Sequence, residues 1–293
     1  MRLIKGHGTR NDFLLLPDLD GAIDLAPAAV RALCDRRGGI GADGVLRVVR
    51  SACDPDASEL AEAAEFFMDY RNSDGSVAEM CGNGLRVFFA YLRGIGVVEQ
   101  HAAVATRGGI RRVRACGDDT VTVEIGLPRF LADRPIATAA SRTPGRAPLS
   151  RPGIALQIPN PHIVVELADL AELADLDLRE PPHVDPPLPE GQNVEFVVRT
   201  GPRQLQMRVH ERGAGETMSC GTGICAAAAA LASVDGDSDR QPWTVDVPGG
   251  RCEVTWAADG MVELTGPAVL VGEIEVDDGW LRAATAESAV GAK

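Results

Sequence analysis

The sequence predicts a protein of two similarly built α/β halves, and three observations lead to this fold class. A chain of 293 residues is long for one hydrophobic core and comfortable for two. Short apolar runs typical of strands alternate with helical patterns in each half. A cysteine-glycine motif occurs once in each half, and the polar residues that precede it recur with it.

The repeat is defined by four pairs of anchor positions. Cys81 opens the stretch Cys-Gly-Asn-Gly and Cys220 opens Cys-Gly-Thr-Gly, 139 positions later. The same shift relates Asn72 to Glu211, whereas a shift of 149 relates two earlier pairs, Asn11 with Asn160 and Gly44 with Asn193. The difference of ten falls where the first half carries an extra segment, 51–64. We interpret the halves as duplicated domains related by a pseudo-two-fold axis, whose equivalent positions meet at an interdomain cleft. The alternative is chance repetition of a short motif in a glycine-rich chain.

The first half is predicted element by element. Residues 5–12 form a loop because they combine glycines with Asn-Asp. The helix 27–35 has apolar spacing and stops at two glycines. The remaining elements are strands 13–16, 45–49 and 66–70, a helix over 85–92, two strands within 101–115 joined at 107–109, and a strand over 120–125.

The second half follows the same order. Residues 131–152 are rich in Ala, Pro and Arg, which predicts a loop or a poorly ordered linker. A turn over 157–162 leads into a strand, and the tail after 283 is predicted to fray. The other elements are strands 163–166, 193–198 and 205–209, an alanine-rich helix over 224–234, and strands 244–247, 252–255 and 261–264.

Residues 39–44 match the pattern Gly-x-Gly-x-x-Gly of dinucleotide-binding loops. That function requires a strand before the loop and a helix after it, and here a strand follows. We therefore interpret this segment as a turn.

Composition and charge exclude several classes of protein. The net charge of −13 disfavours nucleic-acid binding, since no basic stripe offsets phosphate repulsion. The apolar run 224–232 is too short to cross a membrane, and the first residues lack the apolar region of a signal peptide. Seven cysteines without regular spacing predict reduced thiols. We expect a soluble, cytoplasmic protein.

The two motif cysteines each precede glycines and a predicted helix. The first amides of a helix lack partners within it and carry partial positive charge, which favours a thiolate and can lower a cysteine pKa. Two such helix starts aimed at one point would form a cage suited to a carboxylate. A thiolate and a thiol on opposite faces of a carbon beside that carboxylate could remove its α-proton and return one with inversion.

The cysteines also allow three other interpretations: packing, metal binding and a disulfide. We expect Cys34, Cys53, Cys116, Cys225 and Cys252 to be packed as small apolar residues. The chain has no Cys-x-x-Cys pair, so no metal site is expected. A disulfide between Cys81 and Cys220 would inactivate the protein rather than serve it.

At this point the motifs resemble those of the diaminopimelate epimerase family over nearly the whole chain. The matching stretches are Lys5–Phe13, Arg71–Ser76 with Glu79–Gly84, Asn160–His162, Asn193–Phe196, Glu211–Thr217 with Cys220–Gly223, and Thr265–Ala268. The resemblance implies an epimerase (an isomerase) that interconverts LL- and meso-diaminopimelate without a cofactor or metal, in lysine and peptidoglycan precursor biosynthesis. It also implies α+β domains, 1–122 with 267–293 returning and 123–266, each a curved, mostly antiparallel sheet around a central helix, with the active site between them.

The resemblance further implies roles for single residues. Cys81 and Cys220 would be the acid–base pair, and His162 and Glu211 would tune their protonation. The reacting carboxylate would be held at Gly82, Asn83, Gly221 and Thr222. The rest of the substrate would contact Asn11, Asn72, Asn160, Asn193, Glu211 and Arg212, with the Arg212 fork suited to the distal carboxylate. A homodimer is implied as well.

Two departures from the family and three rival functions bear on this interpretation. Many members have Gln where this chain has Gly44, so that substrate contact would be missing or made by the backbone. Some members carry an aromatic residue at the dimer interface shortly after the Gly-Pro-Ala motif, whereas Val271-Gly272 follows it here. Isomerase relatives that use carboxylate chemistry would lack cysteine at positions 81 and 220. A proline or hydroxyproline racemase would not need Arg212 and the several Asn residues for a second charged end. A non-catalytic amino-acid-binding protein would not need a thiol in each half.

Overall fold

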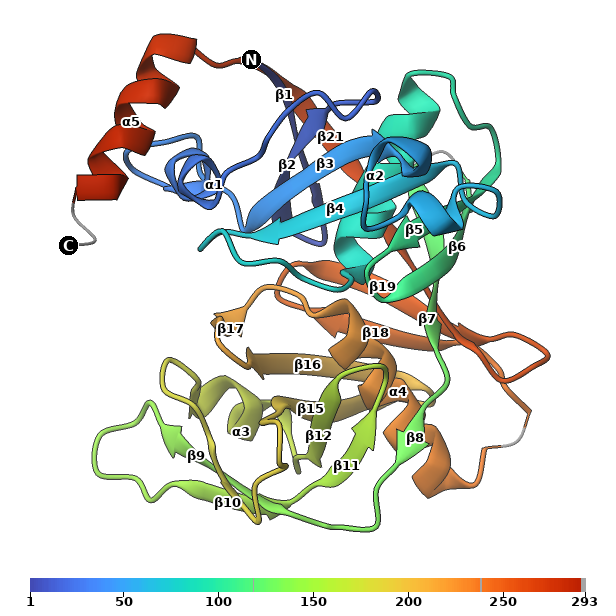
Figure 1. The fold of residues 1–293 in the computed structure, drawn as a ribbon. Coiled ribbons are helices and arrows are strands. Elements are labelled where there is room, and N and C mark those ends of the chain that lie inside the picture. The colour runs from blue at the N-terminus through green and yellow to red at the C-terminus, as the bar shows by residue number, and fades with distance from the viewer. Residues whose placement is uncertain (118, 238, 291–293) are drawn as a thin grey trace. The chain divides into compact units, whose positions relative to one another are not determined.

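The chain folds into two compact units (Figure 1). The structure is a computed structural model that describes residues 1–117, 119–237 and 239–290. The first unit is Met1–Val123 with Pro267–Lys293, and the second is Glu124–Gly266. The predicted mixture of α and β structure is confirmed, because both units combine sheet strands with few helices.

The first unit is a sheet with helices on both faces. Its strands and helices are β1 (Arg2–Gly8), β2 (Asn11–Pro17), α1 (Pro27–Cys34), β3 (Gly44–Arg50), the short 3₁₀ helices η1 (Ser51–Cys53) and η2 (Ser58–Leu60), β4 (Phe66–Asn72), α2 (Gly82–Gly94), β5 (His101–Thr106), β6 (Gly109–Ala115), β7 (Thr120–Gly126), β21 (Val269–Glu275) and α5 (Asp278–Val290). Strand β7 continues into the second unit.

The first two strands form a hairpin, so the prediction of a loop over 5–12 is wrong. Gly8 pairs with Asn11, and the two turn residues Thr9 and Arg10 both have positive φ, 50° and 61°. Positive φ at both turn positions matches the twist that a two-residue hairpin requires. The glycines of β1 are explained by close packing, because a Cβ on Gly6 would lie 2.7 Å from the Val87 side chain of α2.

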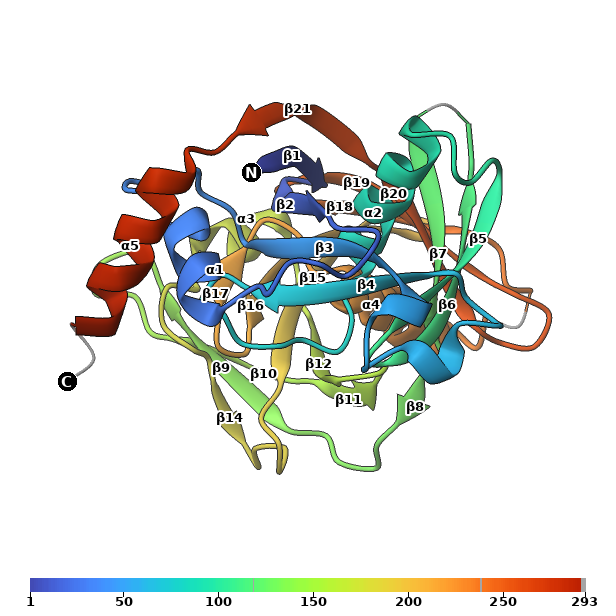
Figure 2. The same ribbon diagram turned by 45° about the horizontal axis from the view of Figure 1, so that its top comes forward.

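Helices α1 and α5 lie side by side on one face of this sheet, as Figures 1 and 2 both show. Leu14 and Leu16 of β2 pack with Val30 and Leu33 of α1 in a buried cluster that includes Leu281 of α5. Helix α2 contacts β1, β2, β3 and β4. Successive residues of a strand point to opposite faces, so the strand residues that alternate with the cluster residues point toward α2. The prediction that the tail frays after 283 is wrong, because α5 continues as a helix to Val290. Residues 291–293 lie outside the described residues.

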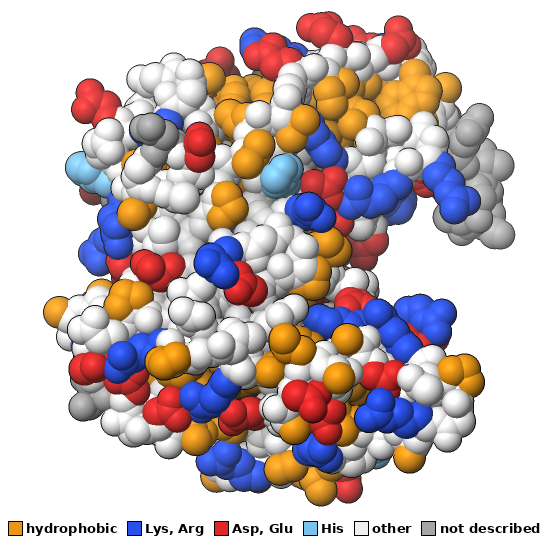
Figure 3. Space-filling view, turned by 180° about the vertical axis from the view of Figure 1, so that it is seen from behind, with side chains coloured by type: hydrophobic (Ala, Val, Ile, Leu, Met, Phe, Trp, Pro, Cys, Tyr) orange, Lys and Arg blue, Asp and Glu red, His pale blue; other side chains and the backbone are white. Residues whose placement is uncertain are grey.

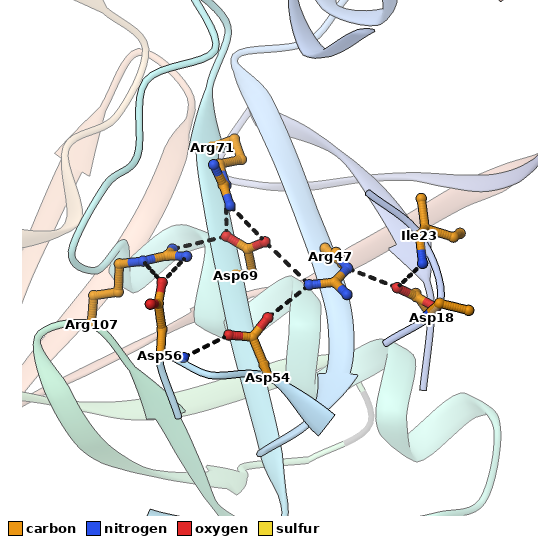
Figure 4. Close-up of polar contacts among 9 residues, drawn as sticks. Asp18, Ile23, Arg47, Asp54, Asp56, Asp69, Arg71 and Arg107 are labelled. Carbon is orange, nitrogen blue, oxygen red and sulfur yellow. Dashed lines mark hydrogen bonds and ion pairs between the residues drawn. The ribbon is translucent and has the colours of Figure 1, made fainter. Parts of the chain in front are cut away.

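A buried ionic network crosses the first unit (Figure 4). Arg47 of β3 bonds to Asp18 and Asp54, each at 2.8 Å, and its guanidinium lies 3.6 Å from Asp69 of β4. Asp69 also pairs with Arg71 at 2.7 Å and with Arg107 at 2.8 Å. Arg107 in turn pairs with Asp56 at 2.7 Å. The network thus attaches the extra segment 51–64 to two strands and to the β5–β6 turn.

The second unit is built around helix α4. Its elements are β8 (Arg129–Phe130), β9 (Ile136–Ser141), β10 (Leu149–Pro152), β11 (Ile154–Gln157), β12 (Pro161–Glu166), α3 (Leu170–Asp175), β13 (Leu176–Asp177), β14 (His183–Asp185), β15 (Asn193–Gly201), β16 (Gln204–Glu211), β17 (Gly215–Thr217), α4 (Gly221–Asp235), β18 (Trp243–Val247), β19 (Gly250–Trp256) and β20 (Val262–Pro267). The alanines of α4 are buried against β11, β12, β15, β16, β18 and β19. Small side chains let the helix sit close to the strands around it.

The segment 131–152 is ordered structure, so the linker prediction is wrong. Strand β9 pairs with β10, β13 and β14 in a small separate sheet. Ala137 and Ala139 of β9 are buried in a core cluster with Val194 and Phe196 of β15. Alternating alanines that look like linker composition are here the small residues of a packed strand face.

The predicted repeat is present in the strand pairing. In the first unit β2 and β3 are parallel with Phe13 opposite Gly44, and in the second β12 and β15 are parallel with His162 opposite Asn193. Phe13 lies two residues after the anchor Asn11, and His162 lies two residues after the anchor Asn160, so the two strand pairs are equivalent. In both units an antiparallel strand follows, and most other pairings are antiparallel. The turn predicted at 39–44 is confirmed, since β3 and no helix follows it.

The surface carries both signs of charge. Lys and Arg side chains are interspersed with Asp and Glu on the face drawn in Figure 3, and the net charge of the sequence is −13. Among the described residues no helix is both long and apolar enough to span a membrane.

Candidate functional site

Each motif cysteine caps the helix that follows it. Cys81 has extended backbone (φ −144°, ψ 118°) and its sulfur accepts a hydrogen bond from the Gly84 amide at 3.3 Å, at the start of α2. Cys220 does the same for α4, with φ −112°, ψ 111° and a 3.4 Å bond from the Gly223 amide. A side chain that accepts from the third helical amide is the usual N-cap arrangement. The two helix starts are therefore equivalent, and the amides of Gly82, Asn83, Gly221 and Thr222 occupy the first two positions of the two helices.

The predicted site residues of the first unit are joined by a directed chain of hydrogen bonds. Arg86, fully buried in α2, donates to Asn83 Oδ1 at 2.9 Å. Asn83 Nδ2 donates to Asn11 Oδ1 at 3.1 Å, and Asn11 Nδ2 donates to Asp43 Oδ2 at 2.7 Å. The Cys81 sulfur lies 3.8 Å from the same Asn11 oxygen. A cation at one end and a carboxylate at the other thus fix the orientation of both amides.

Asn72 lies at the end of β4 beside this chain of bonds. It pairs with Gly44 of β3, and its Nδ2 donates to Ser76 Oγ at 3.0 Å. The backbone amide of Ser73 donates to the Asp43 carbonyl at 3.0 Å. Asp43 therefore connects the Asn72 turn with Asn11.

Gly44 has no room for a side chain. A Cβ there would lie 2.4 Å from the Arg71 carbonyl oxygen and 2.7 Å from the Tyr70 ring. Tyr70 itself packs edge-on against Phe13, with ring centroids 5.9 Å apart. In this packing no side chain fits at position 44, where many members of the family that the sequence resembles have Gln.

Cys220 lies in an acidic, buried environment. Burial raises its pKa well above the ordinary value, and the nearby carboxylates Glu211 and Glu195 raise it further, although bonds with Thr222 and Gly223 lower it. Burial also raises the pKa of Glu211, against the hydrogen bonds with Thr217 and Cys220. The expectation that the helix start lowers the pKa is therefore wrong for Cys220, because burial and like charge outweigh the helix-end effect.

His162 and Glu195 form a second polar group in the same unit. Both side chains are 0% exposed, and His162 Nδ1 lies 2.7 Å from Glu195 Oε1. His162 Nε2 lies 3.1 Å from Asn160 Oδ1. Glu195 lies directly under the first turn of α4, since a Cβ on Gly223 would approach its Oε1 to 2.6 Å.

Asn193 and Arg212 are also adjacent. Asn193 Oδ1 accepts a hydrogen bond from the Arg212 amide at 2.9 Å. The exposed Arg212 side chain donates to the Glu190 carbonyl. Within the second unit the structure therefore brings together Asn160 with His162, Asn193 with Arg212, and Glu211 with Cys220.

The other cysteines divide into two groups. Cys34, Cys225 and Cys252 are buried, as predicted, but Cys53 and Cys116 are exposed, so the packing prediction is wrong for these two. They lie in a short 3₁₀ helix and at the end of a hairpin strand, where the surrounding core does not reach. Among the described residues no group of His, Cys, Asp and Glu has metal-binding geometry.

A hollow at the other end of α4 is a distinct feature. It is lined by Arg199, Arg203, Asp235, Asp237 and Asp239, whose charges pair with one another. Helix α4 has 15 residues, so this end is about 22 Å from Cys220. The hollow is therefore not part of the cysteine site of this unit.

Sequence reasoning missed three residues that touch the predicted site residues: Arg86, Asp43 and Glu195. Each lies within or beside a motif that was recognised, yet none received a role. A signal was present for Glu195, because it is the charged residue in the otherwise apolar run 194–198. A buried carboxylate in such a strand needs a partner, which here is His162.

Known proteins match this chain over most of its length. The family model described as diaminopimelate epimerase matches residues 3–131 and 154–271. A protein from Streptomyces coelicolor named diaminopimelate epimerase is 51% identical over 287 residues, 95% of this chain and 96% of the relative. One of the same name from Thermobifida fusca is 49% identical over 285 residues, 94% and 98% of the two chains.

Solved structures show the same fold at low identity. A phenazine biosynthesis protein of the PhzF family from Bacillus anthracis aligns with a TM-score of 0.69 and 16% identity, covering 94% of this chain and 99% of that one. A probable proline racemase from Agrobacterium radiobacter aligns with a TM-score of 0.64 and 16% identity, covering 97% and 95%. At this identity the likeness concerns the fold alone. The match of the family model and the two relatives assigns the chain to the diaminopimelate epimerase family.

Proposed function

We propose that this protein is an epimerase that interconverts LL- and meso-diaminopimelate by proton transfer at one α-carbon. The family assignment and the relatives named diaminopimelate epimerase support the substrate. The observation that carries the chemistry is the equivalence of Cys81 and Cys220, each the N-cap of the central helix of its unit. A two-base inversion needs one such group for each face of the reacting carbon.

The two thiols take opposite roles in each direction of the reaction. Because burial and two carboxylates raise the pKa of Cys220, we assign the resting proton to it. Cys81, as the thiolate, removes the α-proton, and Cys220 delivers its proton to the opposite face. After turnover Cys81 holds the proton and Cys220 is the thiolate, which is the starting state for the reverse reaction.

The helix starts would supply the electrostatic stabilisation. When the α-proton leaves, negative charge develops on the neighbouring carboxylate, and preorganised donors at that point lower the barrier. The amides of Gly82 and Asn83 in α2, and of Gly221 and Thr222 in α4, are the proposed donors. Arg86, buried below Asn83, adds a positive charge close to the first pair.

The remaining polar residues would hold the unreactive end of the substrate. We assign this task to Asn11, Asn72, Asn160, Asn193, Glu211 and Arg212. Arg212 is exposed and can bind a distal carboxylate through its fork. His162 and Glu211 would tune the protonation of the two cysteines, and the raised pKa of Cys220 beside Glu211 supports this role for Glu211.

Assembly and location are part of the same proposal. Val269, Leu270 and Val271 are exposed on β21, which supports a homodimer through this apolar stretch. The seven cysteines have no regular spacing, which supports a reducing, cytoplasmic location. The proposed reaction uses the residues of the chain alone.

The decisive experiment is isomerisation of LL-diaminopimelate in heavy water under reducing conditions. We expect solvent deuterium at one α-carbon of the meso product, and the Cys81→Ser and Cys220→Ser variants to lose inversion in both directions. Cys116→Ser removes an exposed thiol and serves as the matched control. Undiminished turnover in either motif variant would disprove the two-base mechanism.

The same exchange experiment also tests two rival functions. A proline racemase would exchange the α-proton of L-proline, which lacks the second charged end that Arg212 would bind. A non-catalytic binding protein would retain diaminopimelate without exchange. Exchange of proline, or binding without exchange, would replace the proposed function.

A further inference from the structure

Two buried ionisable side chains, His162 and Glu195, lie under the first turn of α4. The alternation of β15 sends Val194 and Phe196 into the core cluster on one face and Glu195 toward α4 on the other. Glu195 is 0% exposed, and its Oε2 is buried without a hydrogen-bond partner among the described residues. A carboxylate in such a place is costly unless a cation or a proton accompanies it.

Both nitrogens of the His162 ring face oxygen acceptors. Nδ1 lies 2.7 Å from Glu195 Oε1, and Nε2 lies 3.1 Å from Asn160 Oδ1. A neutral imidazole has one N–H and one lone pair. With one proton on Nδ1 and none elsewhere, the lone pair of Nε2 would face the lone pairs of the Asn160 oxygen.

A second proton on the His162–Glu195 pair removes this repulsion between lone pairs. If the pair holds two protons, it is either an imidazolium beside a carboxylate or a neutral ring beside a carboxylic acid. In both forms Nε2 carries a hydrogen that it donates to Asn160, and the pair has no net charge. A pair with one proton would bury a net negative charge beside Glu211 and Cys220, which share this unit's interior with it.

We propose that Glu195 is a positioning residue that keeps two protons on the His162–Glu195 pair and thereby fixes the orientation of Asn160. With its oxygen held by Nε2–H, the Asn160 amide presents its NH₂ group to a ligand. The side chain therefore offers a donor, which suits a carboxylate oxygen of the substrate rather than an ammonium group. This inference rests on the proposed function only for the identity of that ligand.

The first test reads the protons directly and needs no activity. Protein labelled with ¹⁵N in the imidazole rings of its five histidines is recorded by NMR at pH 7, and His162→Gln assigns the signal. We expect Nε2 of His162 to be protonated. An unprotonated Nε2 with the hydrogen on Nδ1 would overturn the proposal. In the Glu195→Gln variant we expect the imidazole ring of His162 to hold one proton, whereas the wild-type His162–Glu195 pair holds two.

The second test is a double-mutant cycle on the epimerase reaction, with Glu195→Gln, Asn160→Ala and the double variant. Loss of one fixed donor corresponds to about threefold to tenfold in binding. We therefore expect Glu195→Gln to raise KM by that factor, with kcat within about threefold, and to raise KM by less than about twofold in the Asn160→Ala background. Equal effects in both backgrounds would show that Glu195 acts only through stability or by another route.

A matched control separates this role from general damage to the sheet. Glu166→Gln makes the same change on the strand of His162, at a half-exposed pair with Arg199, and should leave KM unchanged. If the wild-type protein fails to epimerise diaminopimelate, the proposed function falls while the NMR result still decides the proton arrangement. If epimerisation occurs and Nε2 is unprotonated, the inference about Glu195 fails and the function stands.

Discussion

Gly44 lies directly against the carbonyl group of Arg71, so that a Cβ at position 44 would be 2.4 Å from that oxygen. The two residues belong to neighbouring antiparallel strands, β3 and β4. The opposing atom is backbone and cannot rotate away. This contact allows no side chain at Gly44, the first residue of β3, and so shapes the site of the first unit.

We expect Gly44→Ala to destabilise the protein by about 1–3 kcal/mol, because overpacking must push β3 away from β4. Urea unfolding followed by circular dichroism measures this change. Gly272→Ala is the control, since a Cβ on Gly272 meets nothing within 4 Å, and it should stay within about 0.5 kcal/mol of the wild type. Equal stability of the two variants would contradict the contact.

The sequence predicted most of the architecture because its signals are local. The helices after Cys81 and Cys220 and the four anchor pairs follow from spacing, and they recur in the strand pairing as expected. The hairpin at Thr9 and Arg10 was missed because positive φ at residues other than glycine leaves little trace in a sequence. The alanine strand β9 was missed because its burial depends on β15, more than fifty positions away.

The site was predictable where chemistry depends on residue type and less so where it depends on environment. The cysteines and asparagines were identified from motifs. The high pKa of Cys220 was not predicted, because it arises from burial and from Glu211 and Glu195, which only the folded chain places together. Likewise Arg86 acquires its role from the position of the Asn83 oxygen.

Asp69 is the next test, because its buried carboxylate holds three arginines together (Figure 4). Burial alone would raise its pKa, but the bonds and charges of Arg71 and Arg107 lower it overall. Removing one member of a buried ion cluster leaves the others unpaired, so Asp69→Ala should cost about 3–5 kcal/mol of unfolding free energy.

The control for Asp69 is a pair on the surface. Asp246 bonds to Arg251 at 2.7 Å with both side chains more than a third exposed, and Asp246→Ala should cost less than about 1 kcal/mol. Unfolding in urea at pH 7 compares the two variants. Similar losses for Asp69 and Asp246 would mean that the network is not stabilising.

Asp12 links stability to pH. Burial would raise its pKa, but Arg36 and Lys5 outweigh that effect and lower it to about 2 from 3.8. Since the folded protein holds this proton less tightly, the carboxylate stabilises the fold above the unfolded pKa and loses this effect as the pH falls toward 2. A shift of this size corresponds to about 2 kcal/mol.

The Asp12→Asn variant should therefore be less stable than the wild type by about 2 kcal/mol at pH 6 and by about half as much at pH 3. Urea titrations at both pH values give the difference. Asp20→Asn, at a carboxylate that is 89% exposed, should change stability little at either pH. A deficit of Asp12→Asn that does not shrink between pH 6 and pH 3 would rule out this linkage.

The cysteines should separate by reactivity toward a neutral aromatic disulfide at pH 8. Cys53 and Cys116 are exposed, whereas burial raises the pKa of Cys34 to about 12. At pH 8 the thiolate of Cys34 is then on the order of one part in ten thousand, and a thiol must ionise to react. We expect Cys53→Ser and Cys116→Ser each to remove one fast-reacting thiol. Cys34→Ser should reduce only the number of thiols that react after denaturant is added. A fast phase that persists in the Cys53→Ser/Cys116→Ser double variant and disappears when Cys34 is also replaced would show that α1 opens readily and that Cys34 is not protected by the fold.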